Sequence, residues 1–148
     1  MARGVQCLKD SQRILLATCD IPLITSRAIE DFLDRCGQRT AEIYYPVVPR
    51  EAVEKTFNNV ERTYFTLREG EFTGGNLFLI DPSAVSRCMD IGQQVVDARK
   101  SPLRMSRLLG IPFLLRFVLK RVSLQDAQEK ASALLGVKGV VVVTTYPE

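Results

Sequence analysis

Three short stretches of this sequence carry residue types and spacings that could do chemistry. In "LLATCDIPLIT" (15–25), a carboxylate directly follows an apolar run. In "FTGGN" (72–76), two glycines and an amide side chain precede a second apolar run, and in "ARKSP" (98–102) two cations are adjacent. These residue types offer a ligand for a metal ion, backbone donors for a closely approaching ligand, and positive charge for a phosphate. Each stretch also has an ordinary structural interpretation.

Asp20 is the candidate metal ligand. The run before it, "RILLAT", predicts a short buried strand that ends in a turn, and open α/β sheets bind ligands beyond the carboxyl ends of their strands. A carboxylate in that place suits Mg²⁺, which proteins hold through one or two carboxylates together with phosphates. The alternative is a turn residue, because Asp side chains bond to their own backbone in turns.

The paired glycines are the second candidate. Gly74 and Gly75 stand between Thr73 and Asn76, where a buried strand begins. Glycines there let backbone N–H groups approach a ligand closely, and Asn76 adds a donor and an acceptor. The alternative is a β-bulge or tight turn, in which Asn tolerates an unusual dihedral angle.

The positive charge excess lies in one segment. The whole chain has a net charge of +3, yet residues 98–125 hold seven Lys or Arg and no Asp or Glu. Arg99 and Lys100 in this segment predict either cations that complement the end of a helix dipole or a phosphate clamp. Few aromatic residues interleave with these charges, so we expect no nucleic-acid partner.

The later part of the same segment, "LLGIPFLLRFVLKRV", predicts a helix. Its apolar spacing favours core packing of Phe113, Leu114, Phe117 and Val118. The alternative is a basic amphipathic helix that lies on a membrane or binds a partner.

The composition excludes several classes of site. The chain has no histidine, so Ser-His and Cys-His nucleophile pairs and a His general base are excluded. Its four cysteines form no C-x-x-C pair, which argues against a zinc site and a disulfide scaffold. We find no signal-peptide pattern at the start and no apolar run near the roughly 20 residues of a membrane span. A reducing cytoplasm is therefore the expected location.

The order of the predicted elements gives the expected architecture. Apolar strands alternate with amphipathic helices, which predicts an α/β layered fold with a mostly parallel sheet. No repeat, low-complexity tract or flexible linker interrupts the chain, so we expect a single domain over residues 1–148.

The motifs in their order resemble the MobA-like nucleotidyltransferase family. "LLATCDIPLIT", "RTYFTLREGEFTGGNLFLI", "DARKSPLRMSRLLG" and the closing "YPE" carry the likeness across most of the chain. The resemblance implies a Rossmann-like, glycosyltransferase-A-type fold. It also implies transfer of a nucleoside monophosphate from an NTP to a phosphorylated small-molecule acceptor, with Mg²⁺ as cofactor and release of pyrophosphate.

The resemblance also implies residue roles. Asp20 matches the strand-end aspartate that helps to bind Mg²⁺, and Thr73, Gly74, Gly75 and Asn76 match the acceptor side of the cleft. Arg99 and Lys100 would lie near the phosphorylated acceptor. These are metal-binding and substrate-binding roles, and the resemblance assigns no catalytic residue.

The sequence departs from the family pattern at both ends of the motif series. The glycine-rich phosphate loop that opens family members has no counterpart here, and neither does the second metal-binding aspartate beyond "YPE". We therefore expect a partial nucleotidyltransferase domain that binds NTP poorly alone and forms a homo-oligomer through uncovered sheet edges. The alternatives are a non-catalytic binding or regulatory module and a peripheral membrane protein that uses residues 99–121.

Overall fold

The computed structural model describes residues 4, 7–8, 10–37, 40–57, 60, 62–98 and 101–147, with the backbone alone for part of the 86–105 region. The strands are β1 (Ile14–Ala17), β2 (Ile43–Pro49), β3 (Phe65–Leu67), β4 (Gly70–Gly74), β5 (Leu77–Ile80) and β6 (Gly139–Val143). The helices are α2 (Ser26–Gly37), α3 (Arg50–Thr56), α4 (Pro82–Ala98), α5 (Pro102–Leu109), α6 (Ile111–Val118) and α7 (Leu124–Leu135). The apolar patterns thus predict the elements correctly, and the α/β class is confirmed.

The prediction of a mostly parallel sheet is wrong. The pairing order is β1-β5-β2-β4-β3 with β6 on the other side of β2, and among the described strands only β2 and β6 pair in parallel. The other pairings are antiparallel, because the β3–β4 hairpin reverses the chain and sends β5 back between β1 and β2. Strands apolar on both faces do not require parallel neighbours, because helices cover both faces of this sheet.

A two-residue bulge joins β4 to β5. Val47 of β2 faces Gly74 and Tyr44 faces Leu79, so Gly75 and Asn76 are extra residues on their side of the ladder. Pro46 lies opposite this bulge, where a strand needs no ladder N–H, and its carbonyl accepts a hydrogen bond from the Gly75 N–H at 2.9 Å. The bulge therefore lets a proline occupy a central strand, although the sequence pattern favours an edge or irregular position for it.

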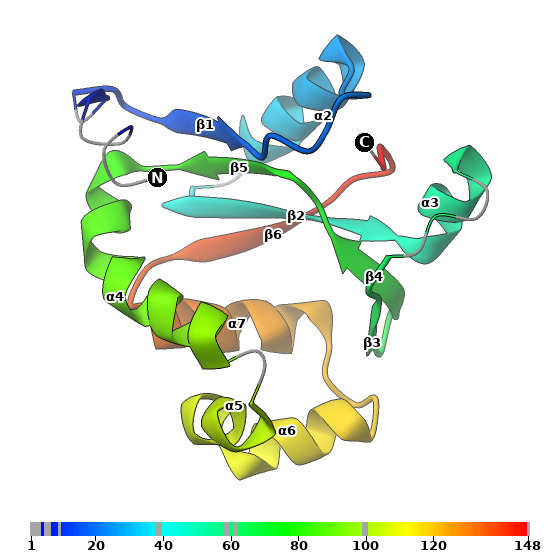
Figure 1. Cartoon of the computed structure of the whole chain (residues 1–148), viewed down its shortest axis with the longest axis vertical. Coiled ribbons are helices and arrows are strands. Elements are labelled where there is room, and N and C mark those ends of the chain that lie inside the picture. Colours follow the sequence, from blue (N-terminus) through cyan, green and yellow to red (C-terminus); the bar gives the residue numbers. More distant parts are fainter. Residues whose placement is uncertain are drawn as a thin grey trace.

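The sheet lies between two helical layers (Figure 1). On one face, Phe32 and Cys36 of α2 pack in a core cluster with Tyr44, Leu77 and Val142. On the other face lie α4 and α7, and α5 and α6 continue beyond them at the end of the molecule opposite α2 (Figure 1). A second core cluster, of Val47, Leu67, Phe72 and Val122, packs against side chains from the α6 and α7 region.

Candidate functional site at one edge of the sheet

Three strands end at the same edge of the sheet. β1 and β2 both run antiparallel to β5, and β6 runs parallel to β2, so β1, β2 and β6 point the same way. Backbone hydrogen bonds join the segments at this edge: Thr18 N–H donates to Asn76 O at 3.1 Å, and Thr144 N–H donates to Val47 O at 3.0 Å. The residues after β1 and β6 therefore meet the β4–β5 bulge, as the strand-end argument requires.

Asp20 lies just beyond β1, exposed to solvent. The side chain of Thr18 and the backbone of Asp20 itself lower the pKa of this carboxyl group. Thr18 Oγ1 is buried and has no partner of hydrogen-bond geometry in the described part of the chain. Asp20 is thus an anion at neutral pH, open to solvent and three residues after the last residue of β1.

The paired glycines have packing reasons of their own. A side chain at Gly74 would overlap the hydroxyl of Tyr45, and a Cβ at Gly75 would lie 2.8 Å from Pro46 Cγ. Tyr45 in turn packs against Phe78, with ring centroids 5.4 Å apart. The close approach that the glycines permit is therefore made by the neighbouring strand β2, as the bulge interpretation predicts.

The four residues from Thr73 to Asn76 do not act as one surface. Gly75 and Asn76 line a small hollow of about 10 Å³ together with residues before and on α2 and after β6: Ile24, Ala28, Phe32, Thr144 and Tyr146. Thr73 is buried within β4, and Gly74 lies against Tyr45. Of these four residues, the structure thus brings only Gly75 and Asn76 to the sheet edge at which β1 ends, just before Asp20.

A polar cluster that sequence reasoning missed holds the segment after β6 at this edge. Asp31 Oδ2 accepts hydrogen bonds from Arg35 Nε at 2.8 Å and from Thr144 Oγ1 at 2.9 Å. The Arg35 guanidinium lowers the pKa of Asp31, partial burial opposes that effect, and the Thr144 hydrogen bond adds to it. The i,i+4 spacing of Asp31 and Arg35 is visible in the sequence, whereas the contact with Thr144, 113 residues away, has no sequence signal.

The described residues offer limited metal chemistry. No group of three or more His, Cys, Asp or Glu side chains that could hold a metal ion occurs among them. A divalent cation bound at Asp20 would thus have this one carboxylate as its ligand from the described residues, and phosphate and water oxygens would have to supply the other ligands. Arg99 and Lys100 lie outside the described residues.

One further finding concerns the helices. Over the ranges that the structure describes, none is long and apolar enough to cross a lipid bilayer.

The comparisons with known proteins give one significant similarity. No protein-family model matches the sequence, and no curated protein matches it. Among solved structures, the chain is similar to one from Thermus thermophilus described as a hypothetical transferase, with 40% sequence identity and a TM-score of 0.87. The similarity covers 99% of this chain and 64% of the Thermus chain. The chain thus spans less than two thirds of the length of the Thermus protein, and the MobA-like family remains a prediction.

Proposed function

We propose that this chain forms the acceptor-side part of a nucleotidyltransferase that moves a nucleoside monophosphate from an NTP to a phosphorylated small molecule. The observation that carries the proposal is the ionised, exposed carboxylate of Asp20 at a sheet edge where β1, β2, β6 and the β4–β5 bulge meet. The similarity to a hypothetical transferase supports the general class of reaction.

The chemistry needs positioning and charge neutralisation. An oxygen of the acceptor phosphate attacks the α-phosphorus of the NTP, the bond from that phosphorus to the bridging oxygen breaks, and pyrophosphate leaves. When bound, Mg²⁺ would neutralise charge on the phosphates. Asp20 would hold that cation, and the amide of Asn76, within the bulge, would orient the acceptor. Neither residue has to transfer a proton, so the lack of histidine is no obstacle.

The other predicted site residues are assigned either to the shape of the bulge or to the binding of phosphate. Gly75 shapes the bulge, and Thr73 and Gly74 support it from within the sheet. We assign Arg99 and Lys100 to the acceptor phosphate on the strength of their charge. We place the binding of the NTP phosphates in a region equivalent to the part of the Thermus protein outside the matched 64%.

The experiment compares this chain with a chimera that joins it to the unmatched part of the Thermus protein. Pyrophosphate release is measured with a panel of NTPs, phosphorylated acceptors and Mg²⁺. We expect release from the chimera and weak NTP binding by the chain alone. Asp20→Asn in the chimera should lower kcat/KM by about 100-fold. Asp34→Asn, which removes an exposed carboxylate on α2, is the matched control and should leave it unchanged. Full activity of the Asp20→Asn chimera would overturn the proposal.

A second candidate function is a non-catalytic binding module. The lack of a multi-carboxylate cluster among the described residues favours it. It predicts that the chimera binds a phosphorylated acceptor, measured by calorimetry, without Mg²⁺-dependent release of pyrophosphate.

Self-association is a separate proposal. β1 pairs with β5 and with no other described strand, and Leu15 on β1 is exposed. An open strand edge invites pairing with a second chain, so we propose that the chain forms a homo-oligomer through β1. Sedimentation should show concentration-dependent association, and a monomer at high concentration would contradict it.

A further inference from the structure

The helix α6 turns an apolar stripe toward solvent. Its most exposed side chains are Ile111 (67%), Leu115 (58%), Val118 (75%) and the following Leu119 (62%). At 3.6 residues per turn these four positions fall within about 100° of arc. Phe113, on the opposite side, packs against the second core cluster. The prediction of core packing therefore holds for Phe113 and fails for Val118, and α6 contributes no buried residue.

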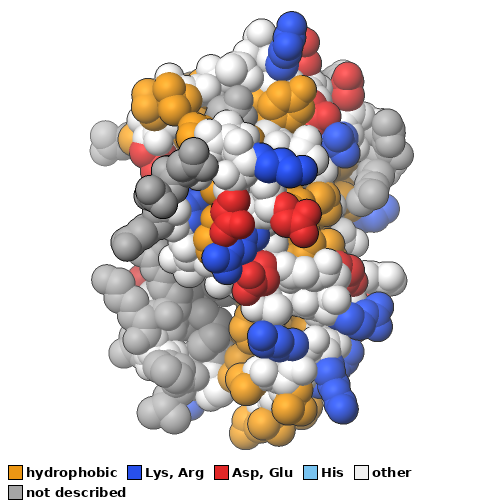
Figure 2. All heavy atoms as spheres, turned by 90° about the vertical axis from the view of Figure 1, so that its right-hand side faces the viewer, with side chains coloured by type: hydrophobic (Ala, Val, Ile, Leu, Met, Phe, Trp, Pro, Cys, Tyr) orange, Lys and Arg blue, Asp and Glu red, His pale blue; other side chains and the backbone are white. Residues whose placement is uncertain are grey.

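Cations surround this stripe. Arg107, Lys120 and Arg121 are exposed, and in the described part of the chain their side chains pair with no carboxylate. They belong to the segment 98–125, which contains seven basic and no acidic residues. Figure 2 shows hydrophobic side chains gathered at the lower end of the molecule, where α5 and α6 lie, with Lys and Arg side chains beside them.

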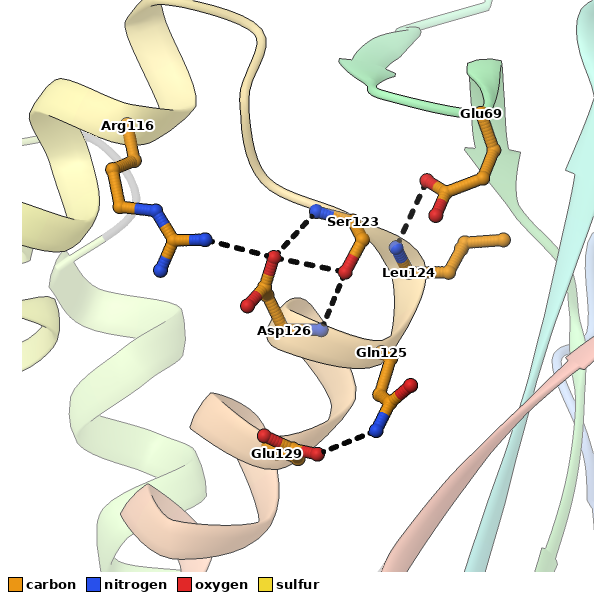
Figure 3. Close-up of polar contacts among 7 residues, drawn as sticks. All are labelled: Glu69, Arg116, Ser123, Leu124, Gln125, Asp126 and Glu129. Carbon is orange, nitrogen blue, oxygen red and sulfur yellow. Dashed lines mark hydrogen bonds and ion pairs between the residues drawn. The ribbon is translucent and has the colours of Figure 1, made fainter.

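The stripe is held in this orientation by specific contacts at the start of α7 (Figure 3). Asp126 Oδ2 accepts hydrogen bonds from the Ser123 N–H at 2.9 Å, the Ser123 hydroxyl at 2.8 Å and Arg116 Nη2 at 3.0 Å. The Leu124 N–H donates to the Glu69 carboxylate at 3.0 Å. These contacts tie α6 to α7 and to the β3–β4 hairpin, so the outward position of the stripe is a property of the fold.

We propose that α6 and its basic surroundings dock this protein on the surface of an anionic lipid bilayer. The apolar stripe would lie at the boundary of headgroups and acyl chains, while the cations contact lipid phosphates, as in interfacial amphipathic helices. A second copy of this chain fits the surface poorly, because two such faces would bring like charges together. The surface is at the end of the molecule opposite α2, so the proposal is independent of the proposed function.

The first experiment uses fluorescence, because the chain contains no tryptophan. Val118→Trp places a reporter on the stripe, and Leu23→Trp places one at another exposed apolar position, before α2. With vesicles of phosphatidylcholine and phosphatidylglycerol at 3:1, we expect a blue shift for Val118→Trp and none for Leu23→Trp. Equal shifts for the two, or no shift for Val118→Trp, would overturn the proposal.

The second experiment measures vesicle co-sedimentation of the otherwise unchanged chain. We expect binding to the anionic vesicles, weaker binding at 0.5 M than at 0.1 M NaCl, and little binding to phosphatidylcholine alone. Lys120→Gln with Arg121→Gln should weaken binding by about 25-fold, at about fivefold per cation. Arg27→Gln with Lys55→Gln removes two exposed cations elsewhere and should have a smaller effect.

The apolar contribution is tested by Leu115→Ser with Val118→Ser. Loss of these two side chains should weaken binding at least tenfold, whereas Leu23→Ser with Leu33→Ser, at exposed positions on or before α2, should not. Circular dichroism confirms that each variant folds. Binding to an acidic protein with no preference for anionic vesicles would also overturn the proposal.

Discussion

The two ends of this molecule are built in opposite ways. At the sheet edge near α2, polar groups from distant segments meet. The Thr144 hydroxyl donates a hydrogen bond to the Asp31 carboxylate, and the Thr18 N–H donates one to the Asn76 carbonyl. At the α6 end, the apolar stripe and the cations come from one short stretch of chain and remain uncovered. The first arrangement depends on the backbone path of the whole sheet, so small changes in packing should disturb it. The second should tolerate substitution without loss of stability, because little packs against it.

The largest effect should follow from filling the bulge. A Cβ at Gly75 would lie 2.8 Å from Pro46 Cγ, in a ring that cannot rotate away. We expect Gly75→Ala to lower the free energy of unfolding by about 2–3 kcal/mol. Urea denaturation measures the loss.

Gly74→Ala is the matched control for this bulge variant. It would overlap the Tyr45 hydroxyl, the far end of a side chain that can move, so we expect a smaller loss of about 1 kcal/mol. An equal loss for the two variants would contradict the view that the proline ring makes Gly75 the stricter position.

A smaller effect should follow from removing the cap of α7. The Ser123 side chain accepts a hydrogen bond from the Asp126 N–H at 3.0 Å, and the two residues form a reciprocal capping box. Ser123→Ala should lower the free energy of unfolding by about 1 kcal/mol. Ser26→Ala, at the first residue of α2, has an exposed side chain and is the comparison. A loss no larger than that of Ser26→Ala would show that the cap does not stabilise the α6–α7 junction.

The same cap should make the free energy of unfolding depend on pH in the acid range. Hydrogen bonds from Ser123 N–H and its hydroxyl, with Arg116 in addition, lower the pKa of Asp126 from 3.8 to about 2. A carboxyl whose pKa is lower in the folded state stabilises the fold fully above its unfolded pKa, and this contribution is lost as the pH falls toward the folded value. The stability difference between the wild type and Asp126→Asn should therefore shrink between pH 5 and pH 3. Urea midpoints across that range test it, and a constant difference would contradict it.

A small gain in stability should come from a substitution at Lys120, which follows the C-cap of α6. Lys120 has a φ of 55°, in the left-handed region that favours glycine. Lys120→Gly should raise the free energy of unfolding by about 0.5 kcal/mol, because relief of strain exceeds the greater flexibility of the unfolded chain. It should at the same time weaken vesicle binding, since it removes a cation. A variant that loses both stability and vesicle binding would point to a structural role for the lysine.

The smallest effect should be that of a change on the stripe itself. Val118 is 75% exposed, so Val118→Ser should alter the free energy of unfolding by no more than about 0.5 kcal/mol. Thermal denaturation checks this. A larger loss would mean that the stripe is covered in the folded protein, and the contrast between the two ends would then fail.

The helices and strands could be predicted from the sequence because they depend on local patterns of residues. The apolar run "RILLAT" predicted β1, and the apolar run after Asn76 predicted β5. The Ser123–Asp126 capping box of α7 is likewise a local feature, since capping acts within four residues. The direction of the strands could not be obtained in this way. An apolar run is the same for either direction, and the position of β5 between β1 and β2 depends on the hairpin that precedes it.

In the candidate site, too, some features follow from the local sequence and others from the tertiary structure. The sequence by itself determined that Asp20 follows a strand, that paired glycines precede the run that becomes β5, and that positive charge gathers after residue 98, because residue order and composition carry this information. Only the tertiary structure decided that Gly75 and Asn76, but not Thr73, meet the segment after β6. It also decided that Asp31 bonds to Thr144 and that α6 faces solvent. The physical reason is that contacts between residues far apart in the chain, and the exposure of a helix face, depend on which surfaces the whole fold leaves next to each other.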